Sequence, residues 1–189
     1  MVIDLRRLIS DASDAMAKGR YEIAIKRYNK VLDYDRFNAA ALNNLAVIYI
    51  NTAQLDAAEK AIMTLLEDVN TINDEAAAFN HLAVVYIRTG RILQASKLLE
   101  HALSLDPFKI ETFYNMTNAH ALLGDIEKSL HYALEAVKID PTSSAAFNNL
   151  GTVLNSMAKF EEARIAFETS IELDKRNQEP MVNLASLYS

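Results

Sequence analysis

The chain has 189 residues, of which 51% are hydrophobic, and a formal net charge of -6 at pH 7. A continuous core is therefore possible, whereas the negative charge argues against binding to the phosphate backbone of nucleic acids, which requires a basic surface. The absence of cysteine excludes disulfides, thiol nucleophiles and cysteine-ligated zinc, and four glycines and three prolines leave few turns for a sheet, so we expect an all-α fold.

The N-terminal segment, residues 1–16, has Asp4 among its first residues. It contains no apolar run long enough for a signal peptide or a membrane span. We therefore expect a cytoplasmic protein that does not enter a membrane.

A period of 34 residues runs through the chain. Pro107 and Pro141 each follow an aspartate and are 34 residues apart, and Asp174 has the same phase one period further on. We interpret residues 1–189 as a single array of helical hairpins at 5–38, 39–75, 76–109, 110–143 and 144–177, followed by the first helix of a sixth at 178–189. The second hairpin is three residues longer than the others, and the surplus near residues 71–75 predicts a longer loop or an extended helix.

Small residues recur at two places in each hairpin. One set marks the point where the first helix must stop and turn: Gly19, Ala53, Gly90, Gly124 and Ala158. The other set lets two antiparallel helices approach closely. It places Ala46, Ala83 and Gly151 on first helices opposite Ala58, Ala95 and Ala163 on second helices.

These residues resemble the pattern of the tetratricopeptide-repeat (TPR) family, in which Leu-Gly/Ala, Tyr, Gly, Ala and Pro recur at fixed places. The resemblance covers nearly the whole chain and implies a right-handed α-solenoid of five helical hairpins plus one additional C-terminal helix. It also implies that the first helices line a concave groove, with their second, fifth, sixth, ninth and twelfth positions towards a protein or peptide ligand.

The two ends of the array differ in polarity. In the first helix, Arg7, Asp11 and Asp14 occupy the face that is apolar in the internal repeats, as a solvent-facing cap requires. The last helix instead shows an apolar stripe of Met181, Leu184 and Tyr188. We expect either that the chain is the front part of a longer protein or that this stripe forms a homodimer.

The sixth position of the first helices holds Ser10 and then a ladder of Asn44, His81, Asn115, Asn149 and Asn183. A carboxamide offers one acceptor and two donors, so a row of them can pair with the backbone of an extended peptide. The ladder is similar to that in the TPR region of O-linked N-acetylglucosamine transferases; the alternative is that these amides bond to carbonyls of neighbouring helices. The predicted peptide-binding residues are the ladder together with Asn43, Asn80, Tyr114, Asn118 and Asn148.

The predicted groove is nearly neutral. Its first three repeats offer apolar side chains, which suit hydrophobic anchors unless they belong to the core: Ile9, Met16, Val47, Ile50, Val84 and Ile87. Its later repeats are polar, with Thr152 and Asn155 beside the residues named above. TPR domains that grip a C-terminal carboxylate place Lys or Arg at these positions, whereas this chain has Ala40, Ala77 and Glu111 at the second position, so such a clamp is not expected.

No catalytic constellation is found, and we expect neither an enzyme nor a cofactor. The four histidines, His81, His101, His120 and His131, lack the spacing of a helical metal site. His120 takes the place of a packing tyrosine, and His81 alone faces the predicted groove. The first functional hypothesis is an adaptor or scaffold that binds a protein segment. The alternative is the N-terminal substrate-recognition region of a larger enzyme, such as a glycosyltransferase of the kind named above.

Overall fold

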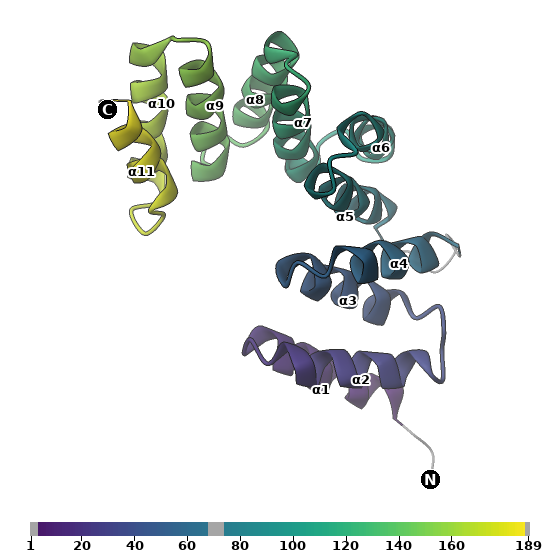
Figure 1. Ribbon diagram of the computed structural model, residues 1–189. Coiled ribbons are helices and arrows are strands. Elements are labelled where there is room, and N and C mark those ends of the chain that lie inside the picture. The colour runs from purple at the N-terminus through teal and green to yellow at the C-terminus, as the bar shows by residue number, and fades with distance from the viewer. Residues whose placement is uncertain (1–3, 68–73, 188–189) are drawn as a thin grey trace. The chain divides into compact units, whose positions relative to one another are not determined.

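The computed structural model describes residues 4–67 and 74–187, and within these ranges the chain forms eleven α-helices and no strand (Figure 1). The helices are α1 (Leu5–Ala17), α2 (Tyr21–Leu32), α3 (Ala39–Asn51), α4 (Leu55–Leu66), α5 (Glu75–Arg88), α6 (Ile92–Leu105), α7 (Ile110–Leu122), α8 (Ile126–Ile139), α9 (Ser144–Ser156), α10 (Phe160–Leu173) and α11 (Glu179–Ser186). The prediction of an all-α fold of stacked helical hairpins is confirmed. No helix of the described ranges has both the length and the apolar character needed to cross a bilayer.

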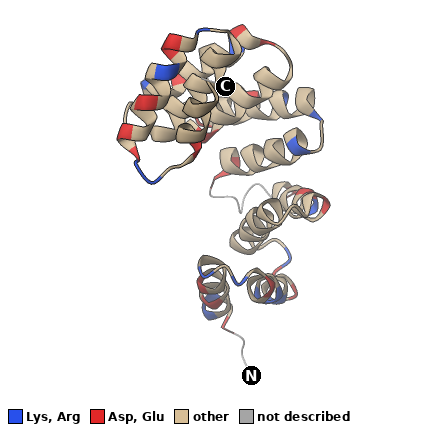
Figure 2. Ribbon diagram, turned by 60° about the vertical axis from the view of Figure 1, so that its left-hand side comes forward, with Lys and Arg blue, Asp and Glu red and all other residues tan. Residues whose placement is uncertain are grey.

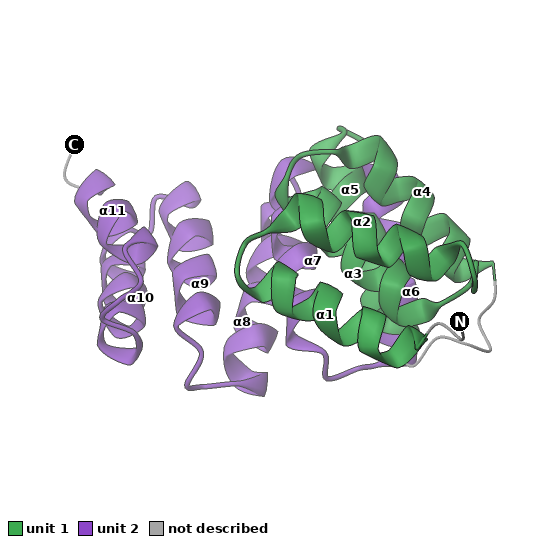
Figure 3. Cartoon of the chain, turned by 90° about the horizontal axis from the view of Figure 1, so that it is seen from below, with its two compact units in different colours: residues 1–91 green, residues 92–189 purple. Residues whose placement is uncertain are grey.

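Two compact units divide the chain, residues 1–91 and residues 92–189 (Figure 3). In the first unit α1 pairs with α2 and α3 with α4, and in the second α7 pairs with α8 and α9 with α10. The boundary falls between α5 and α6, inside the predicted third repeat. The description of residues 1–189 as one uninterrupted array therefore stays a prediction.

Polar caps explain where several helices begin. The side chains of Asp4, Asn38, Asp74, Asp125 and Ser143 each accept a hydrogen bond from the backbone N–H three residues later, at 2.8–3.2 Å. Such a cap satisfies one of the orphan donors of the first turn. Four of these caps begin the first helices α1, α3, α5 and α9, and Asp125 begins the second helix α8. The first helix of each hairpin starts within one residue of the predicted repeat boundary. The surplus predicted near residues 71–75 lies largely outside the described residues; α5 begins at Glu75.

Left-handed residues end the first helices at the predicted places. Gly19, Gly90 and Gly124 have φ of 68°, 80° and 75°, and Ala53 and Ala158 adopt the same conformation at 59° and 57°. The next residue in each case donates its N–H to a carbonyl five residues back, at 2.8–3.0 Å. This is the Schellman arrangement, which the chain needs to reverse direction between two antiparallel helices.

The seam of each hairpin contains the predicted small residues. Ala46 and Ala58 are fully buried in the first unit, and Ala163 is fully buried in the second. Gly151 on α9 lies against the ring of Phe167 on α10, a core residue that packs with Leu150. The absence of a side chain at residue 151 therefore makes room for an aromatic ring.

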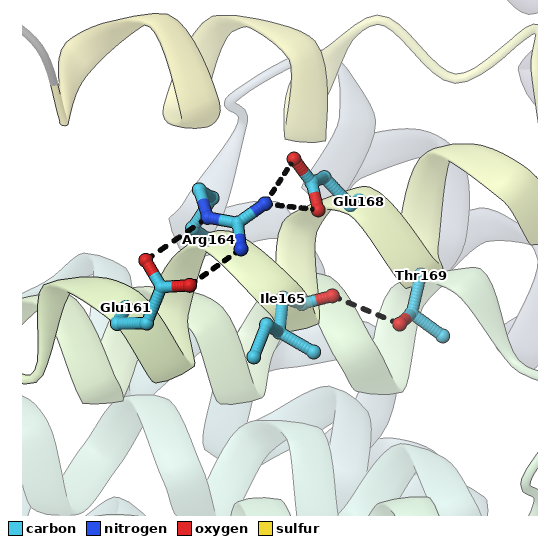
Figure 4. A network of polar contacts seen from close by, with 5 residues as sticks. All are labelled: Glu161, Arg164, Ile165, Glu168 and Thr169. Atoms are coloured by element: carbon cyan, nitrogen blue, oxygen red, sulfur yellow. Dashed lines mark hydrogen bonds and ion pairs between the residues drawn. The ribbon is translucent and has the colours of Figure 1, made fainter.

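From the second hairpin to the fifth, charged side chains are concentrated on the second helices, and α3 and α9 contain none (charges in Figure 2). On α10, Arg164 donates to Glu161 at 3.0 Å and to Glu168 at 2.7 Å (Figure 4). On the first unit, Arg91 makes two hydrogen bonds to Glu59 at 2.8 and 2.6 Å and lies 3.8 Å from the ring centre of Tyr86. This second cluster joins α4 to the end of α5, and the sequence pattern did not predict it.

The last helix differs in part from its prediction. Met181 is 39% exposed, as expected for an uncovered stripe, but Leu184 packs against the core cluster that includes Phe167, so the expectation that Leu184 is uncovered was wrong. Tyr188 lies outside the described residues. Dimerisation through this helix stays a prediction, as does the cytoplasmic location.

Candidate functional site

A pocket of about 410 Å³ lies in the second unit between α7 and α9, at the start of α11. Its lining brings together four of the predicted peptide-binding residues, Tyr114, Asn115, Asn118 and Asn149. The remaining lining residues are Thr117, Ala121, Thr152, Val153 and Glu179. We call this the α7–α9 pocket. Its volume falls in the range of about 300–1,000 Å³ that is usual for ligand pockets.

Helical spacing explains why these residues meet. Asn115 and Asn118 are three residues apart on α7, and Asn149 and Thr152 are three apart on α9, so each pair lies on one face of its helix. The helices pack side by side. The hydroxyl of Tyr114 shares a hydrogen bond of 2.6 Å with that of Ser143, the N-cap of α9, and this contact ties the two helices together at one end of the pocket.

Two carboxamides in the pocket are available to a ligand. Asn118 is exposed and Asn149 is half-buried, and neither side chain forms a hydrogen bond with another described residue. The hydroxyls of Thr117 and Thr152 instead donate to carbonyls of their own helices, Phe113 at 2.8 Å and Asn148 at 3.0 Å. The pocket therefore offers a ligand the side-chain amides of Asn118 and Asn149, each with one hydrogen-bond acceptor and two donors.

Tyr114 and Glu179 are the titratable side chains in the lining of the pocket. Burial raises the pKa of Tyr114, the hydrogen bond with Ser143 opposes this shift less strongly, and the carboxylates of Asp140 and Glu111 add smaller increases. The phenol is consequently neutral at physiological pH. Glu179, the one charged side chain of the lining, was missed in the sequence analysis although it occupies the second position of the sixth repeat, where ligand contacts were expected.

Asn148 and Asn183 contact each other and do not line the α7–α9 pocket. Asn148 is only 3% exposed, and the amide nitrogen of Asn183 donates to its side-chain oxygen at 2.9 Å. These two residues join α9 to α11, so the side chain of Asn148 does not reach the pocket surface. For Asn183, one residue of the ladder, this contact is an interhelical hydrogen bond of the kind that the alternative interpretation describes.

The predicted residues of the first unit lie on α3 and α5. Asn43, Asn44 and His81 are half-buried, whereas Asn80 is 4% exposed and donates to the carbonyl of Ala76 at 3.0 Å. The expected apolar residues of the first three repeats, from Ile9 to Ile87, are all half-buried. Arg88, the last residue of α5, donates to the carbonyl of Ile50 and joins α5 to the end of α3.

None of the described residues forms a cluster of three or more side chains that could ligate a metal ion. His101 and His131 are exposed, and His120 is buried where its ring stacks on Tyr132 at 5.3 Å between ring centres. His120 therefore serves as a packing residue in the described structure.

Family models described as tetratricopeptide repeat match residues 15–79, 76–109, 110–143 and 132–165. Among curated proteins, the small glutamine-rich tetratricopeptide repeat-containing protein 2 of Mycosarcoma maydis is 31% identical over 77 residues, which are 41% of this chain and 22% of that protein. The match thus spans less than a quarter of the relative's length.

Solved structures show the same architecture. The thermophilic TPR protein TTC0263 of Thermus thermophilus superposes with a TM-score of 0.83 at 18% identity, covering 98% of this chain and 99% of that one. YrrB, described as a TPR protein with an unusual peptide-binding site, superposes with a TM-score of 0.66 at 19% identity, covering 95% and 91%. At these identities the likeness concerns the fold.

Proposed function

We propose a function on the following premise. This chain belongs to the tetratricopeptide-repeat family and is a protein–protein interaction module. Our proposal is that the α7–α9 pocket binds an extended peptide segment of a partner protein, chiefly through the partner's main chain. The chain would then act as an adaptor or scaffold.

The observation that carries the proposal is the pair of amides at Asn118 and Asn149. They lie on facing helices in one pocket and have no hydrogen-bonding partner among the described residues. An extended peptide presents alternating N–H and C=O groups, which a carboxamide can match as donor and acceptor at once. Such pairing is indifferent to the side chains of the peptide, in keeping with a lining that has no cation and one carboxylate.

Apolar surface in the same pocket supports a peptide ligand. Val153 and Ala121 lie beside the amides, so that a side chain of the ligand can be buried while its main chain is paired. In the first unit, the half-buried Asn44 and His81 and the apolar residues of α1, α3 and α5 offer a second stretch of the same kind. We propose that each unit contacts its own part of a ligand.

A direct test starts with peptides selected from a random display library by the intact chain. Their affinity would be measured by fluorescence anisotropy for the wild type and for the Asn118→Ala/Asn149→Ala variant. Loss of both amides removes several hydrogen bonds, and we expect the affinity to fall about tenfold or more. The matched control is Gln94→Ala, which removes an exposed carboxamide from the second helix α6 of the same unit, outside the pocket lining.

Main-chain pairing can be tested separately. N-methylation of a selected peptide at single positions removes backbone donors and leaves its side chains intact, so it should weaken binding at the paired positions. If substitution of the ligand's side chains decided affinity and N-methylation did not, the proposed mode of recognition would be wrong.

The second candidate function is the substrate-recognition region of a larger enzyme, such as a transferase similar to O-linked N-acetylglucosamine transferases. What favours it is the pattern of amides on the first helices of both units. This second candidate function uses the same α7–α9 pocket. It predicts that the selected peptides are themselves substrates of an enzymatic domain encoded in the same gene. A reading frame that ends after residue 189 would contradict it.

A further inference from the structure

A second pocket, of about 470 Å³, lies in the first unit and contains none of the predicted peptide-binding residues. It is formed by α2, α3 and α4, with the second helices of two repeats on its sides. Its lining consists of Asn29, Leu32, Arg36, Leu42, Leu45, Tyr49, Ala57, Lys60, Ala61 and Thr64. We call this the α2–α4 pocket. Leu42 and Leu45 are 3% and 2% exposed, so the pocket reaches down to the hydrophobic core.

The pocket is lined by small residues at two positions where the first, third and fourth repeats carry larger ones, whereas the fifth repeat also has an alanine, Ala166, at the place of Ala61. Ala57 and Ala61 on α4 correspond to Gln94 and Leu98 on α6 and to Lys128 and Tyr132 on α8, by the spacing of the repeats. In the first repeat, Arg27 takes the place of Ala61 and donates to the carbonyl of Asp11 at 2.6 Å.

The fourth repeat shows what kind of group fills this place. There Tyr132, which corresponds to Ala61, stacks on His120 with ring centres 5.3 Å apart and planes inclined by 23°. His120 corresponds to Tyr49 of the second repeat, and Tyr49 lines the α2–α4 pocket. The second repeat therefore keeps one ring of an aromatic pair and lacks the other. Offset stacking of aromatic rings stabilises contacts beyond the burial of area.

Basic groups surround this apolar hollow. Lys60 is exposed and forms no ion pair with any described residue. Arg36 pairs with Glu67 at 3.4 Å, but the two side chains are 71% and 54% exposed, so the pair is weak and open to exchange. The lining has no carboxylate, in a protein whose formal net charge is -6.

We propose that the α2–α4 pocket binds an aromatic side chain of an acidic segment from a partner protein. The ring enters beside Ala57 and Ala61 and stacks on Tyr49, as Tyr132 stacks on His120 within the fourth repeat. Carboxylates next to the aromatic residue meet Lys60 and Arg36. This surface is formed by α2, α3 and α4, and its residues and chemistry differ from those of the α7–α9 pocket, so the two proposals can fail independently.

The test uses a fluorescein-labelled, amidated peptide of sequence Gly-Glu-Glu-Phe-Glu-Glu-Gly and the intact chain. Two matched peptides replace Phe by Ala, or every Glu by Lys. We expect measurable binding of the first peptide, at least tenfold weaker binding of both matched peptides, and affinity that falls with added salt. No binding of the first peptide, or equal binding of all three, overturns the proposal.

Variants locate the site. Ala61→Leu introduces the residue that the third repeat has at this position, and it should lower the affinity for the acidic peptide about tenfold or more. Ala57→Gln, also taken from the third repeat, is a second filling variant at a half-buried position. Lys60→Glu should weaken binding, whereas Lys97→Glu, the same change at the corresponding place one repeat further on, should not. Circular dichroism and the melting temperature verify that each variant is folded.

Methyl and side-chain amide NMR provides the final readout. Binding of the acidic peptide should shift the methyl signals of Leu42 and Leu45 and leave the side-chain amide of Asn149 unchanged. Shifts confined to Asn118 and Asn149 would assign the peptide to the α7–α9 pocket and overturn the inference.

Discussion

The side-chain amide of Asn183 on α11 donates a hydrogen bond of 2.9 Å to the side-chain oxygen of Asn148 on α9. Asn148 is almost fully buried, so this oxygen depends on a protein donor. The contact joins the last described helix to the hairpin before it. Asn148 and Asn183 differ in this respect from Asn118 and Asn149, whose side-chain amides form no hydrogen bond within the described residues.

Removal of this contact should affect stability and not ligand binding. Asn183→Ala leaves the buried oxygen of Asn148 without its donor, and we expect the free energy of unfolding to fall by about 1–3 kcal/mol. Urea denaturation followed by circular dichroism measures the loss. Asn118→Ala, which breaks no hydrogen bond to a described residue, serves as the control and should change stability by less than about 0.5 kcal/mol. A weakened affinity for selected peptides in Asn183→Ala, without loss of stability, would show that Asn183 contacts the ligand after all.

Gly151→Ala should destabilise the second unit. A Cβ at this place would lie 2.6 Å from Cδ1 and Cε1 of Phe167, which is 1% exposed and cannot move away freely. We expect overpacking to cost about 1–3 kcal/mol, partly offset by the better helix propensity of alanine, about 1 kcal/mol.

A compensating variant makes that prediction specific. Gly151→Ala with Phe167→Leu recreates the pair of residue types that the sequence has at Ala83 and Leu99. The double variant should be closer to wild-type stability than the sum of the two single changes predicts, as measured by a double-mutant cycle. Additive effects would mean that the strain does not come from this ring.

Glycine at the two left-handed alanines should stabilise the protein. Ala53 and Ala158 have φ of 59° and 57°, a conformation that costs an L-residue about 1–2 kcal/mol. Part of the gain is lost because glycine increases the entropy of the unfolded chain. Ala53→Gly and Ala158→Gly should therefore each raise the free energy of unfolding by up to about 1 kcal/mol, seen as a higher melting temperature. Gly90→Ala is the reverse experiment: its Cβ would meet nothing within 4 Å, so any loss of stability reports backbone strain alone.

Acid should destabilise the second unit through His120. Burial lowers the pKa of His120 below its ordinary value of 6.5, while the carboxylate of Asp125, 3.6 Å from Nδ1, opposes this shift less strongly. The unfolded chain then binds more protons than the folded one between the lowered pKa and 6.5, so stability is complete above this window and is lost as the pH falls through it. Denaturation of the wild type at a series of pH values between 7.5 and 5 should show this loss.

His120→Leu tests the origin of that pH dependence, because the fifth repeat has Leu154 at the corresponding position. The variant should lose less stability than the wild type between pH 7.5 and 5. His131→Gln is the control, since it removes an exposed histidine of the same unit and leaves His120 in place. The prediction is wrong if the two variants behave alike.

The period of the sequence was sufficient to predict the helices and their order. Helix ends depend on a few neighbouring residues. The left-handed residues Gly19 and Ala53 and the caps Asn38 and Ser143 act on the backbone of their own segment, so the local sequence is enough to predict where these helices begin or end. The location of four predicted residues in one pocket also follows from helical spacing and from the stacking of first helices.

Only the tertiary structure decided which asparagines are available to a ligand. Asn148 and Asn149 are adjacent in sequence, yet one is buried against Asn183 and the other lines a pocket, because a helix turns each successive side chain by about 100° and the neighbouring helix then determines its partner. The α2–α4 pocket has the same origin: Ala57 and Ala61 are ordinary helix residues in the sequence, and only the packing of α4 with α2 and α3 shows that a hollow lies beside them.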